Sequence, residues 1–219
     1  MHDSVKNLGD INKEISLKVK ENISPKVIAV SKTFKMSQIL PLIKYGHLHF
    51  GENKVQEAIE KWQNIKNEYP NIRLHLIGGL QTNKVKLAVK LFDYIHSLDN
   101  EKLAKKISEE QIKQKKKVKI FIQVNLGEEE QKSGILKKNL KSFFDLCQNL
   151  NLDIIGLMCI PPQFKPTKPF FDELNFLNKE LKLKELSIGM SADYISALES
   201  SATYLRIGSK IFGERNIKF

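Results

Sequence analysis

Cysteine is scarce in this 219-residue sequence, which contains only Cys147 and Cys159. Two cysteines are too few for a disulfide framework, and no CxxC or paired Cys/His spacing indicates structural zinc. Long apolar runs are also missing: the longest nearly apolar stretch, Ile154–Ile160, is far shorter than the roughly 20 residues that cross a bilayer. The first residues lack the apolar segment of a secretory signal. We therefore expect a soluble, cytoplasmic protein that does not contact membranes.

The sequence has no linker rich in proline, glycine or serine, no low-complexity tract and no abrupt change in composition. With 41% hydrophobic and 28% charged residues, the composition is that of a globular protein. Single α/β barrels commonly have about 200–250 residues, so this length suits one large domain. The absence of an internal boundary predicts one domain over residues 1–219.

Acidic residues are outnumbered, with 36 Lys and Arg against 25 Asp and Glu and a formal net charge of +11. Such an excess could serve nucleic acid, a membrane surface or an anionic ligand. The lysines are spread along the chain, however, and no aromatic residues alternate with them to form a stacking surface for single strands. The one dense cluster, Lys113–Lys119, follows a helical pattern and can complement the helix dipole. We therefore expect no nucleic-acid partner.

Short apolar or β-branched runs alternate with longer amphipathic stretches. The predicted strands are Val27–Val30, His47–Phe50, Arg73–Ile77, Tyr94–Ser97, Lys119–Asn125, Ile154–Cys159, Glu185–Ser187 and Tyr204–Arg206. The predicted helices between them are Ser37–Tyr45, Lys54–Glu68, Asn83–Phe92, Glu101–Gln114, Lys137–Asn149, Lys168–Leu181 and Ala192–Ser200, and a further helix, Val5–Asn22, precedes the first strand. Connections of helix length indicate a parallel sheet.

Two parallel folds are compatible with this pattern. A doubly wound open sheet would carry a glycine fingerprint after the first strand, and the segment VIAVSKTFK has none. The eight predicted strands match the number that closes a barrel. We therefore predict an α/β fold, a single-domain (β/α)8 TIM barrel with an extra N-terminal helix. In such barrels the binding and catalytic groups lie in the loops that follow the strands.

Lys32 follows the first predicted strand directly. At the mouth of a barrel its amine would be withdrawn from bulk water, and a desolvated lysine is a nucleophile suited to a Schiff base. The alternative is an ordinary surface lysine in a loop. Its position at a strand end favours the functional interpretation.

Turns of glycine and serine follow the last two strands, at Ser191 and at Gly208 and Ser209. Barrel phosphate sites lie here, where backbone N–H groups and hydroxyls converge on phosphate oxygens. Ordinary turn chemistry explains each turn, but it does not easily explain why both turns lie where barrels usually bind phosphate. A lysine nucleophile, this cradle and Arg206 together meet the requirements of pyridoxal 5′-phosphate (PLP). The aldehyde would take Lys32, the phosphate would take Ser191, Gly208 and Ser209, and the pyridine nitrogen would face Arg206.

Three further positions are open between a binding role and a structural one. Asn53, after the second strand, can contact a ligand or cap the following helix. Met158 can pack in the core or form a soft wall beneath an aromatic ring. Lys132 lies near the end of a long loop and is either a second cation at the mouth or an exposed side chain.

The segments AVSKT, HFGEN-VQE, LIG-LQTNK, KSGI, GLM-IP, IGMSAD and RIGSKIFGERN, in which a hyphen marks a position outside the motif, occur in this order along most of the chain. By these motifs the sequence resembles the pyridoxal phosphate homeostasis protein family, PLP-binding single barrels similar to the N-terminal domain of alanine racemase. The resemblance implies that Lys32 holds PLP as a Schiff base and that Lys132 is a secondary lysine for handling PLP. It implies cofactor contacts at Asn53, Met158, Ser191, Arg206, Gly208 and Ser209. One position departs from the family pattern, which usually has proline where this chain has Gly79, so we expect a more mobile loop there.

The resemblance leaves open whether the protein is an enzyme or a carrier. Arg206 can only donate, so it would leave the ring nitrogen unprotonated and the ring a weaker electron sink. A racemase also needs a second base on the opposite face, which alanine-racemase-like enzymes take from a second domain, and we expect no room for one in 219 residues. We expect a monomeric carrier or buffer in intracellular PLP (vitamin B6) and amino-acid homeostasis, with PLP-dependent apoenzymes as the partners it would supply. A low-activity PLP-dependent amino-acid racemase is the alternative.

A metal-dependent barrel hydrolase is the more distant alternative. His47 and His49 have the HxH spacing that puts two rings on one strand face, and His75 and His96 lie on other predicted strands. Metal sites of this kind usually include a carboxylate at a late strand end, where this chain has the cation Arg206. Inward-facing or capping histidines are the better account, so we expect no metal.

Overall fold

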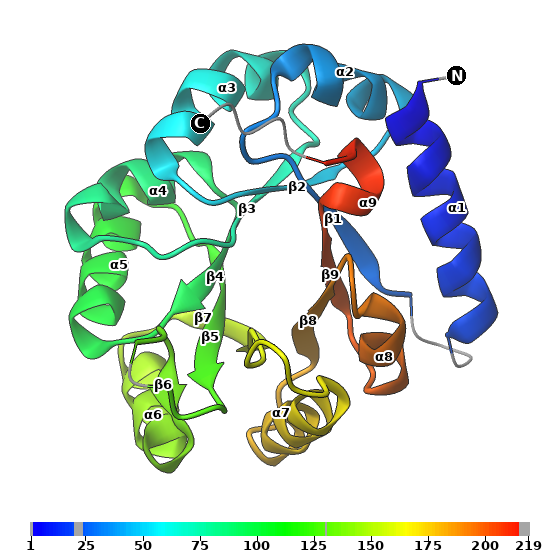
Figure 1. Cartoon of the computed structure of the whole chain (residues 1–219). Helices are drawn as coiled ribbons and strands as arrows, with labels where there is room; N and C mark the ends of the chain where they lie inside the picture. Colours follow the sequence, from blue (N-terminus) through cyan, green and yellow to red (C-terminus); the bar gives the residue numbers. More distant parts are fainter. Residues whose placement is uncertain (1, 20–23, 130, 215–219) are drawn as a thin grey trace.

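A computed structural model describes residues 2–19, 24–129 and 131–214. Eight parallel strands form a closed barrel surrounded by helices (Figure 1). The barrel strands are β1 Lys26–Val30, β2 His49–Glu52, β3 Arg73–Leu76, β4 Tyr94–Leu98, β5 Lys119–Asn125, β7 Asp153–Met158, β8 Glu185–Met190 and β9 Tyr204–Ile207. Each strand pairs with its neighbour in the chain, and pairing of β9 with β1 closes the ring. The predicted TIM barrel is therefore confirmed.

A helix follows each of the eight barrel strands, and the helices surround the barrel. They are α2 Met36–Tyr45, α3 Val55–Glu68, α4 Val85–Leu91, α5 Glu101–Gln114, α6 Leu140–Asn149, α7 Lys168–Glu180, α8 Tyr194–Glu199 and α9 Ser209–Phe212. The predicted N-terminal helix is α1 Asp3–Lys18, and it packs beside α2, α8 and α9. It ends at Lys18, and residues 20–22 of the predicted helix lie outside the described residues. None of the helices in the described ranges has the length and apolar character needed to span a bilayer.

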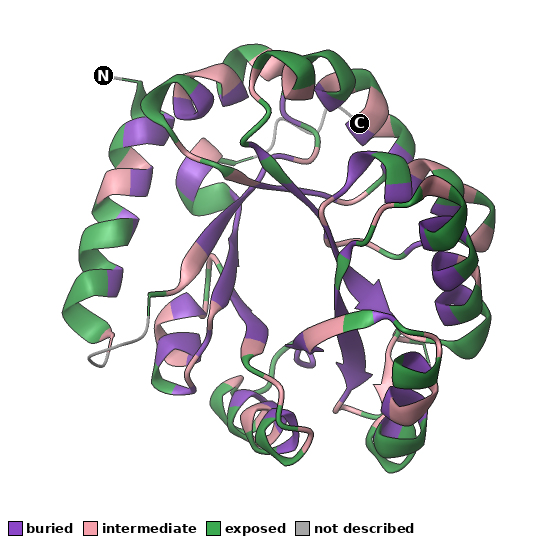
Figure 2. Cartoon of the chain, turned by 180° about the vertical axis from the view of Figure 1, so that it is seen from behind, coloured by how far each residue is buried: buried purple, intermediate pink, exposed green. Residues whose placement is uncertain are grey.

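The hydrophobic core has two layers, one between the strands and the helices and one inside the barrel. Buried residues cover the strands and the inward faces of the helices (Figure 2). Inside the barrel, one cluster contains the side chains of Ile28, Tyr94, Phe121, Met158 and Tyr204. This filled interior leaves the carboxyl ends of the strands as the place for a site.

Strand β2 begins two residues later than the sequence predicts. His47 precedes the strand, and its Nε2 lies 2.9 Å from the backbone oxygen of His49. The strand continues through Glu52, which pairs with Leu76 of β3. The Glu52 side chain is fully buried, and Lys61 Nζ lies 2.9 Å from its carboxylate. His47 and His49 therefore do not form a pair on one strand face, and that part of the sequence interpretation is wrong.

Three short elements lie at the edges of the barrel: one strand and two 3₁₀ turns. The two-residue strand β6, Ile135–Leu136, pairs with the outer end of β5 and was not predicted. Single 3₁₀ turns, Thr82–Lys84 and Lys137–Asn139, begin two of the segments predicted as helices. Residues 131–133, between β5 and β6, line the cavity at the carboxyl ends of the strands.

Candidate cofactor-binding site

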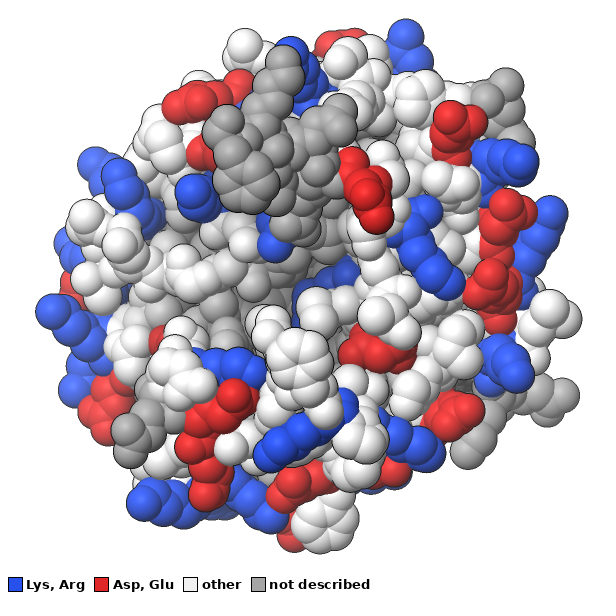
Figure 3. All heavy atoms as spheres, viewed as in Figure 1, with Lys and Arg blue, Asp and Glu red and all other residues white. Residues whose placement is uncertain are grey.

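The carboxyl ends of the strands surround a cavity of about 530 Å³. It lies within the face seen in Figure 3, where the surface is hollowed near the middle and Lys and Arg atoms stand at the edge. The predicted site residues that line it are Lys32, Asn53, Lys132, Ser191, Arg206, Gly208 and Ser209. Residues from loops far apart in the sequence thus meet in one cavity.

Lys32 enters the cavity from the end of β1. Its side chain is half-buried, and the preceding Ser31 is fully buried. The next residue, Thr33, has a φ of 69°, which turns the chain sharply away from the strand. A lysine at this turn faces the ligand space rather than the outside of the barrel, as the sequence predicts.

The turns after β8 and β9 meet beside the strand that precedes Lys32, because β9 pairs with β1 and β8 pairs with β9. Ser191 Oγ accepts hydrogen bonds from the backbone N–H groups of Gly208, at 3.2 Å, and Lys210, at 3.4 Å. The two turns therefore share one oxygen acceptor, at a point where a phosphate oxygen could take the same donors. Gly189 permits the first turn, because it has a φ of +85° and a Cβ there would lie 2.6 Å from the Cβ of Ala197.

Arg206, on β9, lines the cavity and is only 5% exposed. Its Nη1 donates to the backbone oxygen of Ser187, at 2.7 Å, and to Ser187 Oγ, at 2.8 Å, while Nη2 donates to the backbone oxygen of Cys159, at 2.9 Å. These partners are neutral, and burial lowers the pKa of the guanidinium. Within the described ranges no carboxylate forms an ion pair with Arg206. A buried cation in neutral surroundings suits a ligand that brings negative charge or a neutral acceptor.

A chain of imidazole rings runs through the barrel interior behind Arg206. His49 Nδ1 lies 2.9 Å from His75 Nε2, and His75 Nδ1 lies 2.9 Å from His96 Nε2. His96 Nδ1 in turn lies 2.9 Å from Ser187 Oγ, which accepts from Arg206. Burial lowers the pKa of His75 and of His96 well below the ordinary value, and the charge of Arg206 lowers that of His96 further. The guanidinium is therefore supported by neutral imidazoles.

The histidines do not form a metal site in the described structure. Nitrogen-to-nitrogen distances of 2.9 Å between neighbouring rings are those of direct hydrogen bonds, which leave no room for an ion between the two nitrogens. Among the described residues no group of three or more His, Cys, Asp or Glu side chains could hold a metal ion. The histidines act as a polar support inside the barrel.

Lys132 lines the cavity from the loop after β5. Its Nζ lies 2.6 Å from Glu129 Oε2, and the two side chains are 30% and 28% exposed, respectively. The amide of Asn125 donates to the backbone oxygens of Glu129 and Lys132, and the amide of Gln123 donates to that of Ser133. These two buried side chains tie the loop to the strand and bring Lys132 to the mouth.

Asn53 and Met158 lie in different surroundings. Asn53 lines the cavity, and α3 begins beyond it with Lys54 as its N-cap, so the capping alternative is wrong. The backbone of Asn53 lies so close to Gly78 that a Cβ on Gly78 would be 2.3 Å from the Asn53 oxygen. Met158 is fully buried in the barrel cluster and does not line the cavity. Its contact with a ligand stays a prediction.

Sequence reasoning missed several polar residues that shape the site. Gln123 and Asn125 on β5, Ser187 on β8 and Glu52 on β2 are all buried. A signal was available, because a polar residue within an otherwise apolar strand must find a partner when it is buried. Which partner it finds depends on strands and helices that are distant in the sequence.

The sequence comparisons can now be set beside this geometry. The alanine racemase N-terminal domain family matches residues 13–216. The pyridoxal phosphate homeostasis protein of Vibrio cholerae is 38% identical over 204 residues, covering 88% of this chain and 86% of that protein. The protein of the same name from Aquifex aeolicus is 38% identical over 200 residues, covering 87% of each chain.

Solved structures agree with the sequence comparisons. The structure of PipY of Synechococcus elongatus with PLP bound matches with a TM-score of 0.85 and 32% identity. The match covers 96% of this chain and 100% of PipY. Alanine racemase of Clostridium difficile, at 14% identity and a TM-score of 0.73, shares the fold over 99% of this chain but only 57% of its own. The chain therefore belongs to the alanine racemase N-terminal domain family and, within it, to the pyridoxal phosphate homeostasis proteins.

Proposed function

We propose that this protein binds PLP reversibly in the barrel cavity and serves PLP and amino-acid homeostasis as a carrier or buffer. Lys32 would hold the aldehyde carbon through its amine. The turns with Ser191, Gly208 and Ser209 would hold the phosphate, and Arg206 would face the ring nitrogen. The observation that carries this proposal is the convergence of the lysine, the arginine and the two turns on one cavity.

The cavity residues fit the cofactor. The N–H groups of Gly208 and Lys210 already point at one oxygen, Ser191 Oγ. The buried guanidinium of Arg206 has neutral partners, so an anionic cofactor would improve its surroundings. PLP bound to a family member of known structure supports the same assignment. Asn53 and Lys132 line the remaining walls and would complete the set of contacts.

The titratable groups of the cavity favour binding over catalysis. Bound PLP supplies a ring that can accept electrons from a substrate, most strongly when its nitrogen is protonated. Arg206 keeps its own protons and can only donate, so it does not protonate that nitrogen. Among the described residues that line the cavity, Lys32, Lys132 and Arg206 are the only titratable side chains. Lys132 is therefore the candidate for the second base that a racemase requires, and it is already paired with Glu129.

Absorbance spectroscopy tests the binding proposal. Purified protein mixed with PLP should develop the visible band of lysine-bound PLP, and Lys32→Ala should not. Persistence of the band in Lys32→Ala with loss in Lys132→Ala would overturn the assignment of Lys32. For the racemase alternative, chiral chromatography of amino acids incubated with loaded protein should show no turnover. Turnover that disappears in both Lys32→Ala and Lys132→Met would establish the enzyme instead.

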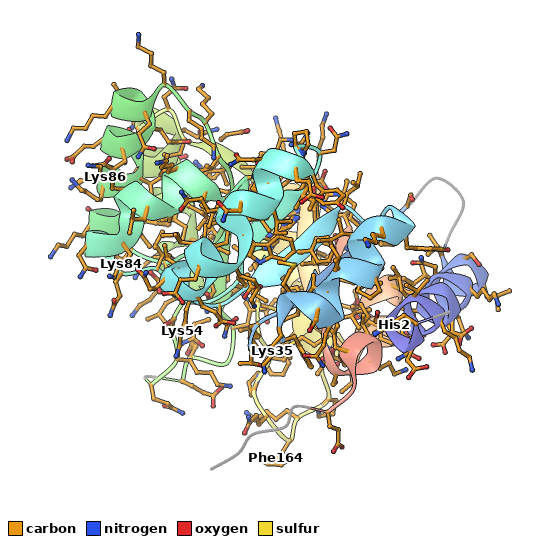
Figure 4. All side chains as sticks on the ribbon, turned by 90° about the horizontal axis from the view of Figure 1, so that it is seen from above. His2, Lys35, Lys54, Lys84, Lys86 and Phe164 are labelled. Carbon is orange, nitrogen blue, oxygen red and sulfur yellow. The ribbon has the colours of Figure 1, made fainter. Side chains whose placement is uncertain are left out.

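PLP-dependent apoenzymes are the partners we propose, with the cofactor leaving through the mouth of the barrel. Phe164, which is fully exposed at 103%, stands at the tip of the loop after β7, on the side of the molecule that carries Lys35 and Lys54 (Figure 4). We further propose that the protein has no nucleic-acid partner, since basic and acidic residues are interspersed over the mouth face (Figure 3). We also propose that it is a monomer. Apoenzyme activation in the presence of a phosphatase that destroys free PLP separates direct transfer from buffering. Light scattering during gel filtration gives the oligomeric state.

A further inference from the structure

The short segment that carries Lys32 is held in an unfavourable backbone conformation. Thr33 has a φ of 69°, in the left-handed region that β-branched residues rarely adopt. Such a conformation is unfavourable and persists only where the surrounding structure enforces it. The surroundings of residues 31–33 should therefore contain a restraint.

That restraint is an ammonium group from helix α3. Lys61 Nζ lies 2.9 Å from the backbone oxygen of Ser31, 2.9 Å from Glu52 Oε1 and 3.0 Å from Glu57 Oε1. A lysine ammonium has three protons, and these three oxygens account for all of them. Only 10% of the Lys61 side chain is exposed. One buried side chain thus ties the peptide before Lys32 to two carboxylates.

The peptide after Lys32 is held by the same network. Glu57 Oε1 accepts the backbone N–H of Thr33, at 2.6 Å. Burial alone would raise the pKa of Glu57, but the hydrogen bonds from Thr33 and Lys61 outweigh it and leave this pKa lowered. The residue is therefore a carboxylate at neutral pH. Both peptide groups that flank Lys32 are bound by a single pair of opposite charges.

Glu52 fixes the other end of the network. Its Oε1 accepts hydrogen bonds from Ser31 Oγ, at 2.7 Å, and from Trp62 Nε1, at 2.9 Å, in addition to Lys61. A buried ion pair is often no more stable than apolar side chains of similar volume. Stability alone does not explain why three charged residues meet directly behind the cavity lysine. A role in orienting that lysine does.

We propose that Lys61 and Glu57, supported by Glu52, are positioning residues for Lys32. This inference rests on the proposed function. The network fixes the direction in which the Lys32 side chain leaves the strand, so that its amine meets the aldehyde while the phosphate occupies the cradle. Without the network the lysine would have to be ordered at the moment of capture, and part of the advantage of a preorganised nucleophile would be lost.

Two ligands separate positioning from folding. Pyridoxine 5′-phosphate carries an alcohol in place of the aldehyde, so it can use the cradle but cannot react with a lysine. In Lys61→Met we expect PLP to bind about tenfold more weakly, equivalent to about 1.4 kcal/mol, while pyridoxine 5′-phosphate binds within a factor of two. Stopped-flow absorbance should show slower capture of PLP. Glu57→Ala should behave similarly, and Glu57→Gln, which keeps an acceptor for the Thr33 N–H, should recover most of the rate.

Lys66→Met is the matched control. Lys66 is on the same helix and forms a half-buried ion pair with Asp93, at 2.7 Å, but does not line the cavity. It should lose stability without changing the ratio of the two affinities. Equal weakening of both ligands in Lys61→Met, or no change in either, would overturn the positioning role. If Lys61→Met does not fold, the two Glu57 variants decide the question, because Glu57 is at the partly exposed edge of the network. Equal binding of both ligands to the wild type would instead refute the proposed function.

Discussion

The two sides of the cavity are supported by opposite kinds of polar network. Behind Lys32, the network is charged: Lys61 bridges Glu52 and Glu57. Behind Arg206, the network consists of neutral imidazoles that end on Ser187. A nucleophilic lysine needs a fixed direction, which ionic hydrogen bonds supply. A buried arginine already carries its charge, and neutral acceptors hold it without cancelling that charge.

We expect acid to destabilise the histidine chain behind Arg206 before it affects the charged network behind Lys32. Burial lowers the pKa of His47 and of His49 to about 4, and those of His75 and His96 are also lowered. Below about pH 6.5 these histidines are protonated in the unfolded chain but stay neutral in the folded protein. The free energy of unfolding therefore falls as the pH falls. We expect a loss of about 2 kcal/mol for each of His47 and His49 between about pH 7 and pH 5, and a further loss in the same direction from His75 and His96.

Urea unfolding at a series of pH values measures this loss. His49 faces the charges of Lys26, Arg73 and Asp93, and His96 faces Arg206, so the cations add to the effect of burial. The loss in His47 and His49 should level off near pH 4, where the folded protein takes up the same protons. A free energy of unfolding that stays constant from pH 7 to 5 would contradict the neutral chain.

Removal of Glu52 should have the next largest effect, on the charged side. Glu52→Ala leaves Ser31, Lys61 and Trp62 without the oxygen that accepts from all three. Breaking a buried pair by removing one partner costs about 3–5 kcal/mol. Glu60→Ala on the exposed face of the same helix should change the unfolding free energy by less than about 0.5 kcal/mol. Equal free energies of unfolding for Glu52→Ala and Glu60→Ala would show that the charged network does not stabilise the fold.

Ser187→Ala tests how the neutral chain is directed. Ser187 Oγ accepts from Arg206, so its single proton should go to His96 Nδ1, and each imidazole should then carry its proton on Nε2. The substitution should cost about 1–3 kcal/mol by leaving buried groups unpaired. Nitrogen NMR of the wild type should show the Nε2–H form of His75 and His96. The Nδ1–H form would reverse the proposed direction.

The smallest effect is expected at Gly79, in the turn after β3. A Cβ there would meet nothing within 4 Å, so Gly79→Ala should change stability by less than about 0.5 kcal/mol. The neighbouring Gly78→Ala should be clearly worse, because its Cβ would lie 2.3 Å from the Asn53 oxygen and displace a cavity residue. Weaker PLP binding by Gly78→Ala, with unchanged binding by Gly79→Ala, would show that the contact between Gly78 and Asn53 supports the binding site. Identical stability and PLP binding of the two variants would contradict this role of Gly78.

Strand ends were the most predictable part of the molecule. The alternation of apolar runs and amphipathic segments predicted the barrel, and the barrel rule then brought Lys32, Ser191 and Gly208 to one cavity. The rule works because parallel strands deliver all their following loops to the same face. No knowledge of side-chain contacts is needed for that inference.

Contacts across the barrel could not be predicted. The sequence predicts β2 over His47–Phe50, whereas the strand is His49–Glu52 and ends on a buried glutamate that pairs with Lys61 of α3. The sequence leaves Met158 open between a core role and a wall of the cavity, and the register of the strands places its side chain in the barrel cluster with Phe121 and Tyr204. The histidine chain joins strands that are far apart in sequence, and only their register brings the rings together.

Peptide mass spectrometry after borohydride reduction tests the central claim most directly. Reduction makes the bond between PLP and its lysine permanent, so the labelled residue can be identified without assumptions about spectra. The account predicts the label on Lys32 in the wild type, and slower labelling of the same residue in Lys61→Met. Labelling mainly on Lys132 or another lysine in the wild type would contradict it.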